Sequence, residues 1–427
     1  MRITVLTSSY PRFPGDGTAP FIQSISEHLA LLGHDVEVVA PYDPAVENAG
    51  GAASPSGVKV HRFRYVWPTR WHIMGHARAM DADVRLRPLS LLLLPLFLMG
   101  AFLKLWQVTG QQRSQPGQQR SQPGRQKSQA IQVNWVLPNG PVAACVAALR
   151  RIPFVVSLHG SDIYFARRNP LFAAVAGWVF RRAAGVTACS PDLGDGALAL
   201  GAREVRLLPY GIDPDVFCPT RRSAAYRQAQ GWADAAVIVT ALGRLVHKKG
   251  FDRLLSAWAR IAERHPEAHL VIGGEGPLRP ALEAQAQQLG LPEKVSFAGR
   301  VPWDQAPEFL ASSEVFVVPS VRDAHGNMDG LPNVVLEAMG CGQAVVASRL
   351  GGIPIVIQDG QNGLLVPPDD VAALAEALER ALQPETRQAL SQAARLSIEQ
   401  KFTWLHTARS LSEMLEQAQA AAKRGIS

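Results

Sequence analysis

The chain has 427 residues, more than one typical domain holds, and its length predicts two or three domains. Hydrophobic residues make up 47% of it, and 43 Lys and Arg against 36 Asp and Glu give a net charge of +7. Much of the basic charge falls between Arg62 and Arg182, which favours an anionic partner for the N-terminal half. Because no recognition-helix, RRM or zinc-finger signature accompanies this charge, we expect a membrane surface or a pyrophosphate-bearing acceptor, and no nucleic acid.

The cysteines are scattered along the chain, without the spacing of a metal site or a disulfide framework: Cys145, Cys189, Cys218 and Cys341. We therefore expect a reducing, cytoplasmic environment. The apolar run Met1–Leu6 is too short for a signal peptide and predicts a first strand instead.

In the N-terminal half, strand and helix patterns alternate. The first strand leads through the loop 7–17 into a helix from about Phe21 to Leu32, which ends at Gly33 in a C-cap position. Further apolar strands are expected at Asp35–Ala40, Phe154–Leu158, Gly185–Cys189 and Val205–Leu208. A second helix is expected at Leu171–Arg182. Such alternation predicts a parallel sheet in a doubly wound domain.

Two segments interrupt this pattern. Leu89–Trp106 is rich in Leu and Phe, but it contains Pro95, Gly100 and Lys104 and falls below the ~20 residues of a spanning helix. We expect a surface helix that dips into a membrane or covers the acceptor site; a core helix is the alternative, and a spanning helix is expected least. Residues 110–129 repeat Gln-Gln-Arg-Ser-Gln-Pro-Gly, a low-complexity composition typical of disordered inserts.

The alternation restarts at Ala236–Leu242 and continues through four more apolar strands, expected at Leu270–Gly273, Val295–Ala298, Val315–Pro319 and Ala344–Ser348. The fold class is therefore α/β, with two Rossmann-like doubly wound domains joined near Pro209–Phe217. Ligands of open α/β sheets bind at the carboxyl ends of the strands, so we expect the site in a central cleft that both domains face.

Two stretches of the C-terminal half carry a pattern suited to a nucleotide diphosphate. Residues 243–250 read Gly-Arg-Leu-Val-His-Lys-Lys-Gly between a strand and the helix predicted at Phe251–Arg264. Arg244 offers a planar fork and Lys249 a point charge, which hold phosphate oxygens in complementary ways. Downstream, a Gly/Pro loop from Asp329 enters a helix, whose N-terminal N–H groups favour an anion. Glu337 lies in an apolar run on that helix, where a ligand hydroxyl would be a good partner for its charge.

With Gly273–Pro277 between them, these two stretches resemble the donor half of the family-four retaining glycosyltransferases, which have the GT-B fold. The resemblance covers nearly the whole chain except about Pro88–Ala130. It implies an N-terminal acceptor-binding domain (1–210), a C-terminal domain that binds a nucleotide-sugar donor (211–400), and a C-terminal helix (401–427) that packs back on the first domain.

The resemblance also implies roles for individual residues. Arg244 and Lys249 would hold the donor diphosphate, Asp329 the sugar and Glu337 the ribose. The family usually has Glu where this chain has the shorter Asp329, which leaves the sugar open. The residues Gly330, Leu331, Pro332, Asn333 and Val334 would form the donor loop. Glu275 would lie near the base or is a plain loop charge.

In the N-terminal half, His159-Gly160-Ser161-Asp162 resembles the family's His-Gly-x-Asp, which places His159 beside the transferring sugar. Gly17 would let the backbone approach the diphosphate; otherwise it marks a turn. Trp135, Pro138 and Gly140 match an acceptor-domain pattern, with Asn134 where the family often has His.

We expect no metal and no cofactor beyond the donor substrate, because Arg244 and Lys249 can neutralise a leaving diphosphate. The Asp-x-Asp pairs at Asp81 and at Asp213 read as solvated charges. The resemblance thus implies a metal-independent, retaining hexosyltransferase at the inner face of the membrane, acting on a lipid-linked or surface-polysaccharide acceptor. The alternatives are another GT-B enzyme such as a nucleotide-sugar epimerase, or a non-catalytic subunit that binds nucleotide sugars.

Overall fold

The computed structural model describes residues 1–13, 15–49, 57–75, 80–81, 85–86, 88–111, 128–324 and 326–425. The chain divides into two compact units, one of Met1–Leu208 with Thr407–Ser427 and one of Pro209–His406. The first boundary thus lies two residues before the one expected at 210. Residues 401–406 belong to the second unit, whereas the sequence placed them with the C-terminal helix.

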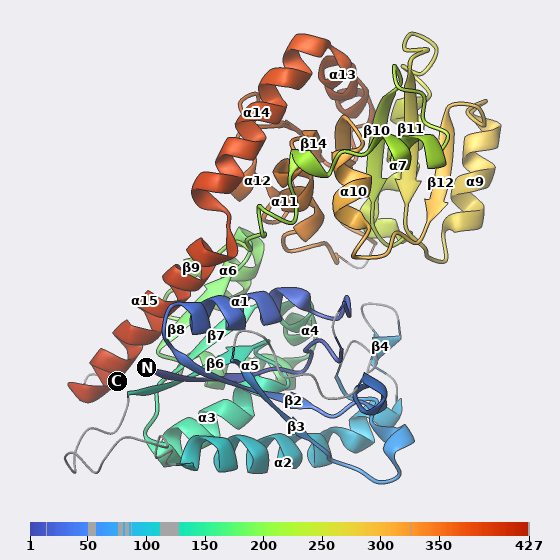
Figure 1. Ribbon diagram of the computed structural model, residues 1–427. Coiled ribbons are helices and arrows are strands. Elements are labelled where there is room, and N and C mark those ends of the chain that lie inside the picture. The colour runs from blue at the N-terminus through green and yellow to red at the C-terminus, as the bar shows by residue number, and fades with distance from the viewer. Residues whose placement is uncertain are drawn as a thin grey trace. The chain divides into compact units, whose positions relative to one another are not determined.

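The N-terminal unit is built on a parallel sheet of seven strands in the order β3-β2-β1-β6-β7-β8-β9, counted over the described residues (Figure 1). β4 and β5 pair separately and antiparallel. The strands are β1 (Arg2–Leu6), β2 (Asp35–Pro41), β3 (Lys59–Phe63), β4 (Met80–Asp81), β5 (Arg85–Leu86), β6 (Gln129–Asn134), β7 (Phe154–Leu158), β8 (Gly185–Ala188) and β9 (Arg206–Leu207).

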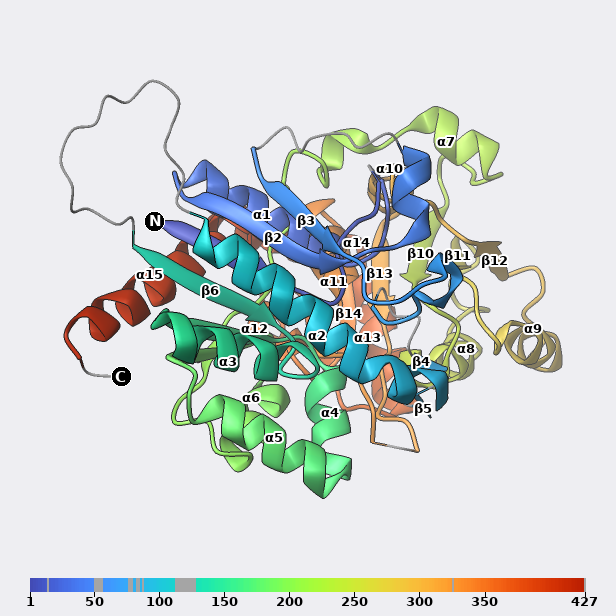
Figure 2. The same ribbon diagram turned by 90° about the horizontal axis from the view of Figure 1, so that it is seen from below.

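Helices cover both faces of this sheet, with α1 on one face and α2 and α3 side by side on the other (Figure 2). The helices of the unit are α1 (Pro20–Leu31), η1 (Pro44–Ala49), η2 (Thr69–Trp71), α2 (Pro88–Gly110), α3 (Asn139–Arg150), α4 (Ser161–Arg168), α5 (Pro170–Phe180), α6 (Pro191–Ala199) and α15 (Trp404–Lys423). The last helix packs on this unit: Ser412 lies 2.7 Å from Nε2 of His34, and Met414 lies beside Gly185.

The apolar segment forms helix α2, which is longer than expected and reaches the length of a membrane-spanning helix. It has 23 residues rather than the 18 of Leu89–Trp106, and its part Leu92–Gly110 has the length and mean hydropathy (1.6) of a membrane-spanning helix. One face of α2 nevertheless belongs to the core. Its side chains are at most 2% exposed: Leu93, Phe97, Ala101 and Leu105. The burial of this face against the sheet favours a core helix over a membrane-spanning one.

The other face of α2 is apolar but exposed. Leu92, Leu96, Met99 and Leu103 are between 48% and 73% exposed and recur at helical spacing. The segment is therefore a core helix and an apolar surface helix at once, on opposite faces. We define these four side chains as the outer stripe of α2.

Two arginines hold the C-terminal end of α2. Arg2 donates to the carbonyl oxygens of Val108 and Gln111, both at 2.6 Å, and also pairs with buried Glu37 at 3.1 Å. Arg150 donates to the carbonyl of Trp106 at 3.2 Å and lies over its ring at 3.6 Å. These contacts satisfy helix-end carbonyls and explain why the helix continues to Gly110, into the range expected for the insert. Residues 112–127 of the expected insert 110–129 lie outside the described residues, and its last residue, Gln129, begins β6.

The C-terminal unit has a parallel sheet of six strands in the order β12-β11-β10-β13-β14-β15 over its described residues. The strands are β10 (Val237–Leu242), β11 (Ala268–Gly273), β12 (Val295–Gly299), β13 (Val315–Val318), β14 (Ala344–Ser348) and β15 (Leu364–Val366). The helices are η4 (Pro219–Arg221), α7 (Ala224–Ala229), η5 (His247–Lys249), α8 (Phe251–Trp258), α9 (Arg279–Gln288), α10 (Ala306–Ala311), α11 (Asn333–Gly340), α12 (Ile353–Val356), α13 (Val371–Leu382) and α14 (Pro384–Lys401).

This strand order reverses direction between β10 and β13, which makes the loops after these two strands the expected ligand site of the domain. In the N-terminal unit the reversal lies between β1 and β6. The predicted fold class, α/β with two Rossmann-like doubly wound domains, is confirmed.

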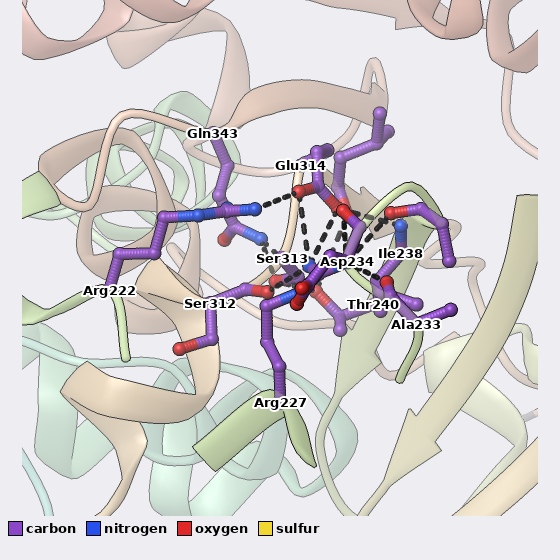
Figure 3. A network of polar contacts seen from close by, with 12 residues as sticks. Arg222, Arg227, Ala233, Asp234, Ile238, Thr240, Ser312, Ser313, Glu314 and Gln343 are labelled. Carbon is purple, nitrogen blue, oxygen red and sulfur yellow. Dashed lines mark hydrogen bonds and ion pairs between the residues drawn. The ribbon is translucent and has the colours of Figure 1, made fainter. Parts of the chain in front are cut away.

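An ion network around the buried Arg227 joins the opposite, amino-terminal ends of these strands (Figure 3). Glu314, the residue before β13, accepts from Arg222 at 2.7 Å, from Arg227 at 3.1 Å and from the N–H of Ile238 at 2.7 Å. Arg227 is 2% exposed and also donates to four backbone carbonyls, those of Ser312, Ala233, Asp234 and Ala236. The network ties α7 to β10 and β13, so it stabilises the sheet at the edge away from the candidate site.

Candidate functional site

The loop after β10 carries the two cations that the sequence singled out. Arg244 follows Gly243 and its side chain is exposed. Lys249 ends the short helix η5, and its side chain turns back, so that a Cβ on Gly243 would lie 3.3 Å from its Cε. Gly250 has φ 66°, and a Cβ there would clash with the carbonyl of Pro319, so this turn requires glycine.

Asp329, in the loop after β13, lies between two lysines. Its Oδ2 is 2.7 Å from Nζ of Lys249, and its Oδ1 is 3.2 Å from Nζ of Lys248. Burial alone would raise the pKa of this carboxyl, but Lys249 and Lys248 together lower it to about 2. The structure thus brings Lys249 and Asp329 together, and it adds Lys248, which the sequence reasoning did not use.

The donor loop predicted from Gly330 to Val334 leads directly into α11. Leu331 and Pro332 are buried, and the helix begins at Asn333, as expected from the sequence. The turn Gly351-Gly352 supports this loop: the N–H of Gly352 donates to the carbonyl of Gly330, and a Cβ on Gly351 would clash with the same oxygen. These contacts of the turn fix the position of the loop.

Asn333 and Glu337 lie one helical turn apart on the same side of α11. Oδ1 of Asn333 is buried and has no hydrogen-bond partner among the described residues. The carboxylate of Glu337 likewise makes no hydrogen bond or ion pair within the described part of the chain, and burial raises its pKa to about 7. Two polar groups are therefore ready to accept hydrogen bonds from a ligand beside the N-terminus of α11.

The loop after β11 packs directly on the loop after β10. The N–H of Leu245 donates to the carbonyl of Glu275 at 2.8 Å, and a Cβ on Gly274 or Gly276 would clash with carbonyls of Gly243 or Leu245. The Glu275 side chain is exposed. The glycines thus have a steric function in the domain, and the role of Glu275 stays a prediction.

In the N-terminal unit, the loop after β1 presents Gly17 on a rigid frame. Asp16 accepts from Nε and Nη2 of Arg12 at 2.7 and 3.0 Å and from the hydroxyl of Thr18 at 2.9 Å, and the pairing lowers its pKa. A Cβ added at Gly17 would meet nothing within 4 Å. Among the described residues of this unit, no group therefore excludes a Cβ at position 17.

His159 follows β7 and is enclosed on several sides. Its Nε2–H donates to Oδ1 of Asn134 at 2.9 Å, and the rings of Phe21 and Trp135 lie 4.9 and 5.1 Å from its own. Burial lowers the pKa of His159 to about 3, so the imidazole is neutral. Asn134, at the position where the family often has His, thus orients the ring.

Asp162 joins the loops after β6 and β7. Its carboxylate accepts from the N–H of Val136 at 2.7 Å and of Gly160 at 3.3 Å, while burial raises its pKa to about 6. This part of the His-Gly-x-Asp motif is structural. The sequence reasoning did not separate the structural aspartate from the candidate histidine.

Among the described residues, no group of three or more His, Cys, Asp or Glu could hold a metal ion. Of the two Asp-x-Asp pairs, Asp213 caps a turn by accepting from the N–H of Asp215 at 2.9 Å. The other pair includes residues 82 and 83, which lie outside the described residues. The four cysteines are all free thiols.

Comparison with known proteins gives matches over both units. The family model described as "Glycosyl transferases group 1" matches residues 223–397, and that of the "Glycosyl transferase 4-like domain" matches residues 16–211. A GDP-mannose-dependent alpha-(1-6)-phosphatidylinositol monomannoside mannosyltransferase of Mycolicibacterium smegmatis is 36% identical over 49% of this chain, which spans 55% of that relative's length. An uncharacterised glycosyltransferase of Methanocaldococcus jannaschii is 26% identical over 96% of each chain.

Solved structures resemble the fold over its whole length. Sucrose-phosphate synthase of Thermosynechococcus elongatus has a TM-score of 0.71 at 21% identity and covers 99% of this chain and 100% of its own. HepE of Anabaena, solved with UDP and glucose, has a TM-score of 0.68 at 20% identity, covering 98% of this chain and 100% of its own. With one family model on each unit and the fold of these enzymes throughout, the chain belongs to the group 1 glycosyltransferases, the family-four type with the GT-B fold.

Proposed function

We propose that the protein transfers a hexose from a nucleotide-diphosphate sugar to a hydroxyl of a lipid-linked or surface-polysaccharide acceptor, with retention of anomeric configuration and without a metal. One observation carries the proposal. The loops at the strand-order reversal of the C-terminal sheet lie at one end of it, together with Lys249, Asp329, the N-terminus of α11 and Glu337, whose carboxylate has no partner among the described residues. Cations and backbone N–H groups bind the phosphates of a nucleotide diphosphate, and a carboxylate accepts a hydrogen bond from a ribose hydroxyl.

In this proposal, Arg244 and Lys249 stabilise the charge that develops on the leaving diphosphate. Glu337 accepts from the ribose, Asp329 binds the sugar, and the loop Gly330–Val334 presents backbone N–H groups. His159 and Gly17 act from the N-terminal domain on the sugar and the diphosphate. The leaving phosphate oxygen takes the proton of the acceptor hydroxyl on the same face, so no protein nucleophile is required. The donor itself is the only cofactor-like molecule.

Some of the relatives support a lipid-linked acceptor, whereas others are named for 2-deoxystreptamine or D-inositol 3-phosphate. Several are named as mannosyltransferases that use GDP-mannose on phosphatidylinositol mannosides. HepE has been solved with UDP-glucose. GDP-mannose and UDP-glucose are therefore the first donors to test, with vesicles that contain a phosphatidylinositol monomannoside as the first acceptor.

A peripheral position at the inner face of the membrane is supported by the outer stripe of α2. Nearby, Trp67 is 85% exposed in the segment after β3, and the exposed Arg64 and Arg70 flank it. The segment packs on α2, since a Cβ on Gly100 would lie 3.3 Å from the carbonyl of Arg64. Leucines that enter the interface and arginines near anionic headgroups contribute additively, each arginine by roughly 1 kcal/mol. Of the other arginines in this region, Arg78 and Arg87 lie outside the described residues, and the structure does not describe the side chain of Arg85.

The activity test measures release of nucleoside diphosphate with and without acceptor. Arg244→Ala and Lys249→Ala should each lower kcat by a hundredfold or more, the effect of losing a contact worth about 2.7–4 kcal/mol in the transition state. Arg264→Ala is the matched control, because Arg264 pairs with Glu379 at 2.9 Å, outside the site. Near-normal turnover by both folded site variants contradicts the diphosphate assignment.

Further readings separate the alternatives. Proton NMR of the first product anomer reports retention or inversion. Conversion of the nucleotide sugar without acceptor indicates an epimerase, and binding without turnover indicates a non-catalytic subunit.

The membrane test uses vesicle co-sedimentation and replaces only exposed residues. Leu92→Ser with Leu96→Ser and Leu103→Ser should release the protein from anionic vesicles and leave donor affinity unchanged. Leu93 and Phe97 are excluded from the design because they are 2% and 0% exposed and their loss would damage the core. Leu31→Ser, 69% exposed on α1 at the other face of the sheet, is a single-site control. Unchanged vesicle binding by the triple variant contradicts membrane association through α2.

A further inference from the structure

Two adjacent lysines reach the same carboxylate from different sides. Lys248 approaches Oδ1 of Asp329 at 3.2 Å and Lys249 approaches Oδ2 at 2.7 Å. All three side chains are at most 17% exposed. The burial of Lys248 beside two residues proposed to bind the donor needs an explanation, because a desolvated charge is costly unless it is paired.

The charges of the cluster explain why one lysine would not be enough. If Lys249 alone paired with Asp329, its charge would be used within the protein. When Lys249 then turned towards a diphosphate, the Asp329 carboxylate would be left buried, unpaired and close to a second anion. With Lys248 present, Asp329 keeps a counter-ion and the cluster keeps one net positive charge for the ligand.

The backbone holds Lys248 in this position. Its carbonyl accepts from the N–H of Val321 at 2.9 Å, in the loop that follows β13 and leads to Asp329. At the end of η5, Gly250 packs against the carbonyl of Pro319 in the same loop. The lysine and the loop that bears the carboxylate are thus fastened together at two points.

We propose that Lys248 is a positioning residue, which holds the Asp329 carboxylate in place so that the charge of Lys249 is available to the donor diphosphate. The inference rests on the proposed function, because it requires a nucleotide sugar as the ligand. It assigns to Lys248 no direct contact with the donor.

A double-mutant cycle tests this assignment. We expect Lys248→Met to weaken binding of the nucleotide sugar and lower kcat/KM about 10- to 100-fold, the range for losing a hydrogen bond to a charged group. Lys248→Arg should restore most of the loss, because it keeps the charge. In an Asp329→Asn background, where no carboxylate needs a counter-ion, Lys248→Met should change donor binding by less than about twofold.

The pH profile gives a readout that a merely structural role would not move. In a Glu337→Gln background, which removes the titration of Glu337 near pH 7, Lys248→Met should shift the remaining acid limb of kcat/KM to higher pH, because Asp329 has lost one of its two cations. Lys294→Met is the matched control, since Lys294 donates to the carbonyl of Pro266 at 2.9 Å, far along the chain from η5. Lys248→Gln replaces Lys248→Met if the latter does not fold.

The outcomes are distinct. Equal losses from Lys248→Met in the wild-type and Asp329→Asn backgrounds would mean that Lys248 acts on the donor itself and would overturn the inference. Wild-type affinity in the folded Lys248→Met protein would overturn it as well, with the proposed function intact. A wild type that binds neither UDP-glucose nor GDP-mannose nor any other nucleotide sugar would overturn both.

Discussion

We predict that binding of the donor releases a proton from Glu337. Its carboxylate has no partner among the described residues, and burial raises its pKa to about 7. At pH 7 about half of the free protein therefore carries a proton at this site. A ribose hydroxyl that donates to Glu337 favours the ionised form, so binding should release that proton.

The magnitude follows from the pKa. A rise from 4.5 to about 7 corresponds to ~3 kcal/mol at 1.36 kcal/mol per unit. The folded state holds this proton more tightly than the unfolded state. Below pH 4.5 Glu337 is protonated in both states and therefore does not lower the free energy of unfolding. The penalty grows as the pH rises through the window and is complete above about pH 7. Glu337→Gln should therefore stabilise the donor-free protein at pH 8 and change its stability little at pH 4.5.

The assay is calorimetric titration of the nucleotide sugar in two buffers with different ionisation enthalpies. A nucleotide sugar is preferred to the free diphosphate, which would contribute its own terminal ionisation. At pH 7 the wild type should release roughly half a proton per site, and donor affinity should rise from pH 6 to pH 8. Glu337→Gln should abolish both effects.

Glu275→Gln is the matched control, because Glu275 is exposed and lies in the neighbouring loop. It should leave the proton release as in the wild type. Proton release that persists in Glu337→Gln, or proton uptake by the wild type, would refute the ribose assignment of Glu337.

Three further predictions use other parts of the molecule. Gly17→Ala should fold with an unchanged Tm, because its Cβ meets nothing within 4 Å, yet lower kcat/KM at least tenfold if the donor approaches this backbone; full activity would make Gly17 a plain turn. Glu314→Ala should lower the free energy of unfolding by about 3–5 kcal/mol in a urea titration, because it leaves Arg227 buried without its carboxylate. Treatment with EDTA should leave turnover largely intact, and a loss that Mn²⁺ or Mg²⁺ restores would show that a metal is required.

The sequence predicted the strands best where they are buried on both faces. Phe154–Leu158 and Ala344–Ser348 match β7 and β14 in full, because central strands of parallel sheets are continuous apolar runs. The same reasoning found the loops after β10 and β13, since their cations and glycines interrupt the apolar pattern.

The strands that the sequence missed lack this signal. β3 (Lys59–Phe63) carries Lys, His and Arg because it is the edge strand of its sheet. β6 (Gln129–Asn134) begins with Gln directly after the low-complexity repeats, and β15 has only three residues. The length of α2 was underestimated because Val108, Thr109 and Gly110 are poor helix formers, which Arg2 compensates by binding the last carbonyls.

Contacts between distant side chains were beyond a single sequence. Nothing in the run of two lysines says that both reach Asp329, some eighty residues later. The pair Asn134 and His159 depends on the register of β6 and β7, in which Asn134 lies opposite Ser157. The motif reasoning therefore located candidate residues, and the structure supplied their partners.

The protonation state of His159 bears on the mechanism that we propose. With a pKa of about 3, the imidazole is neutral at physiological pH and too weak a base to remove a proton from an acceptor hydroxyl. Its Nε2–H is also engaged by Asn134, so the ring serves as a fixed hydrogen-bonding group rather than a proton shuttle. A same-face reaction, in which the leaving phosphate oxygen takes the proton, needs no titrating histidine. The neutral, oriented His159 is therefore compatible with retention and gives no support to a mechanism with a histidine base.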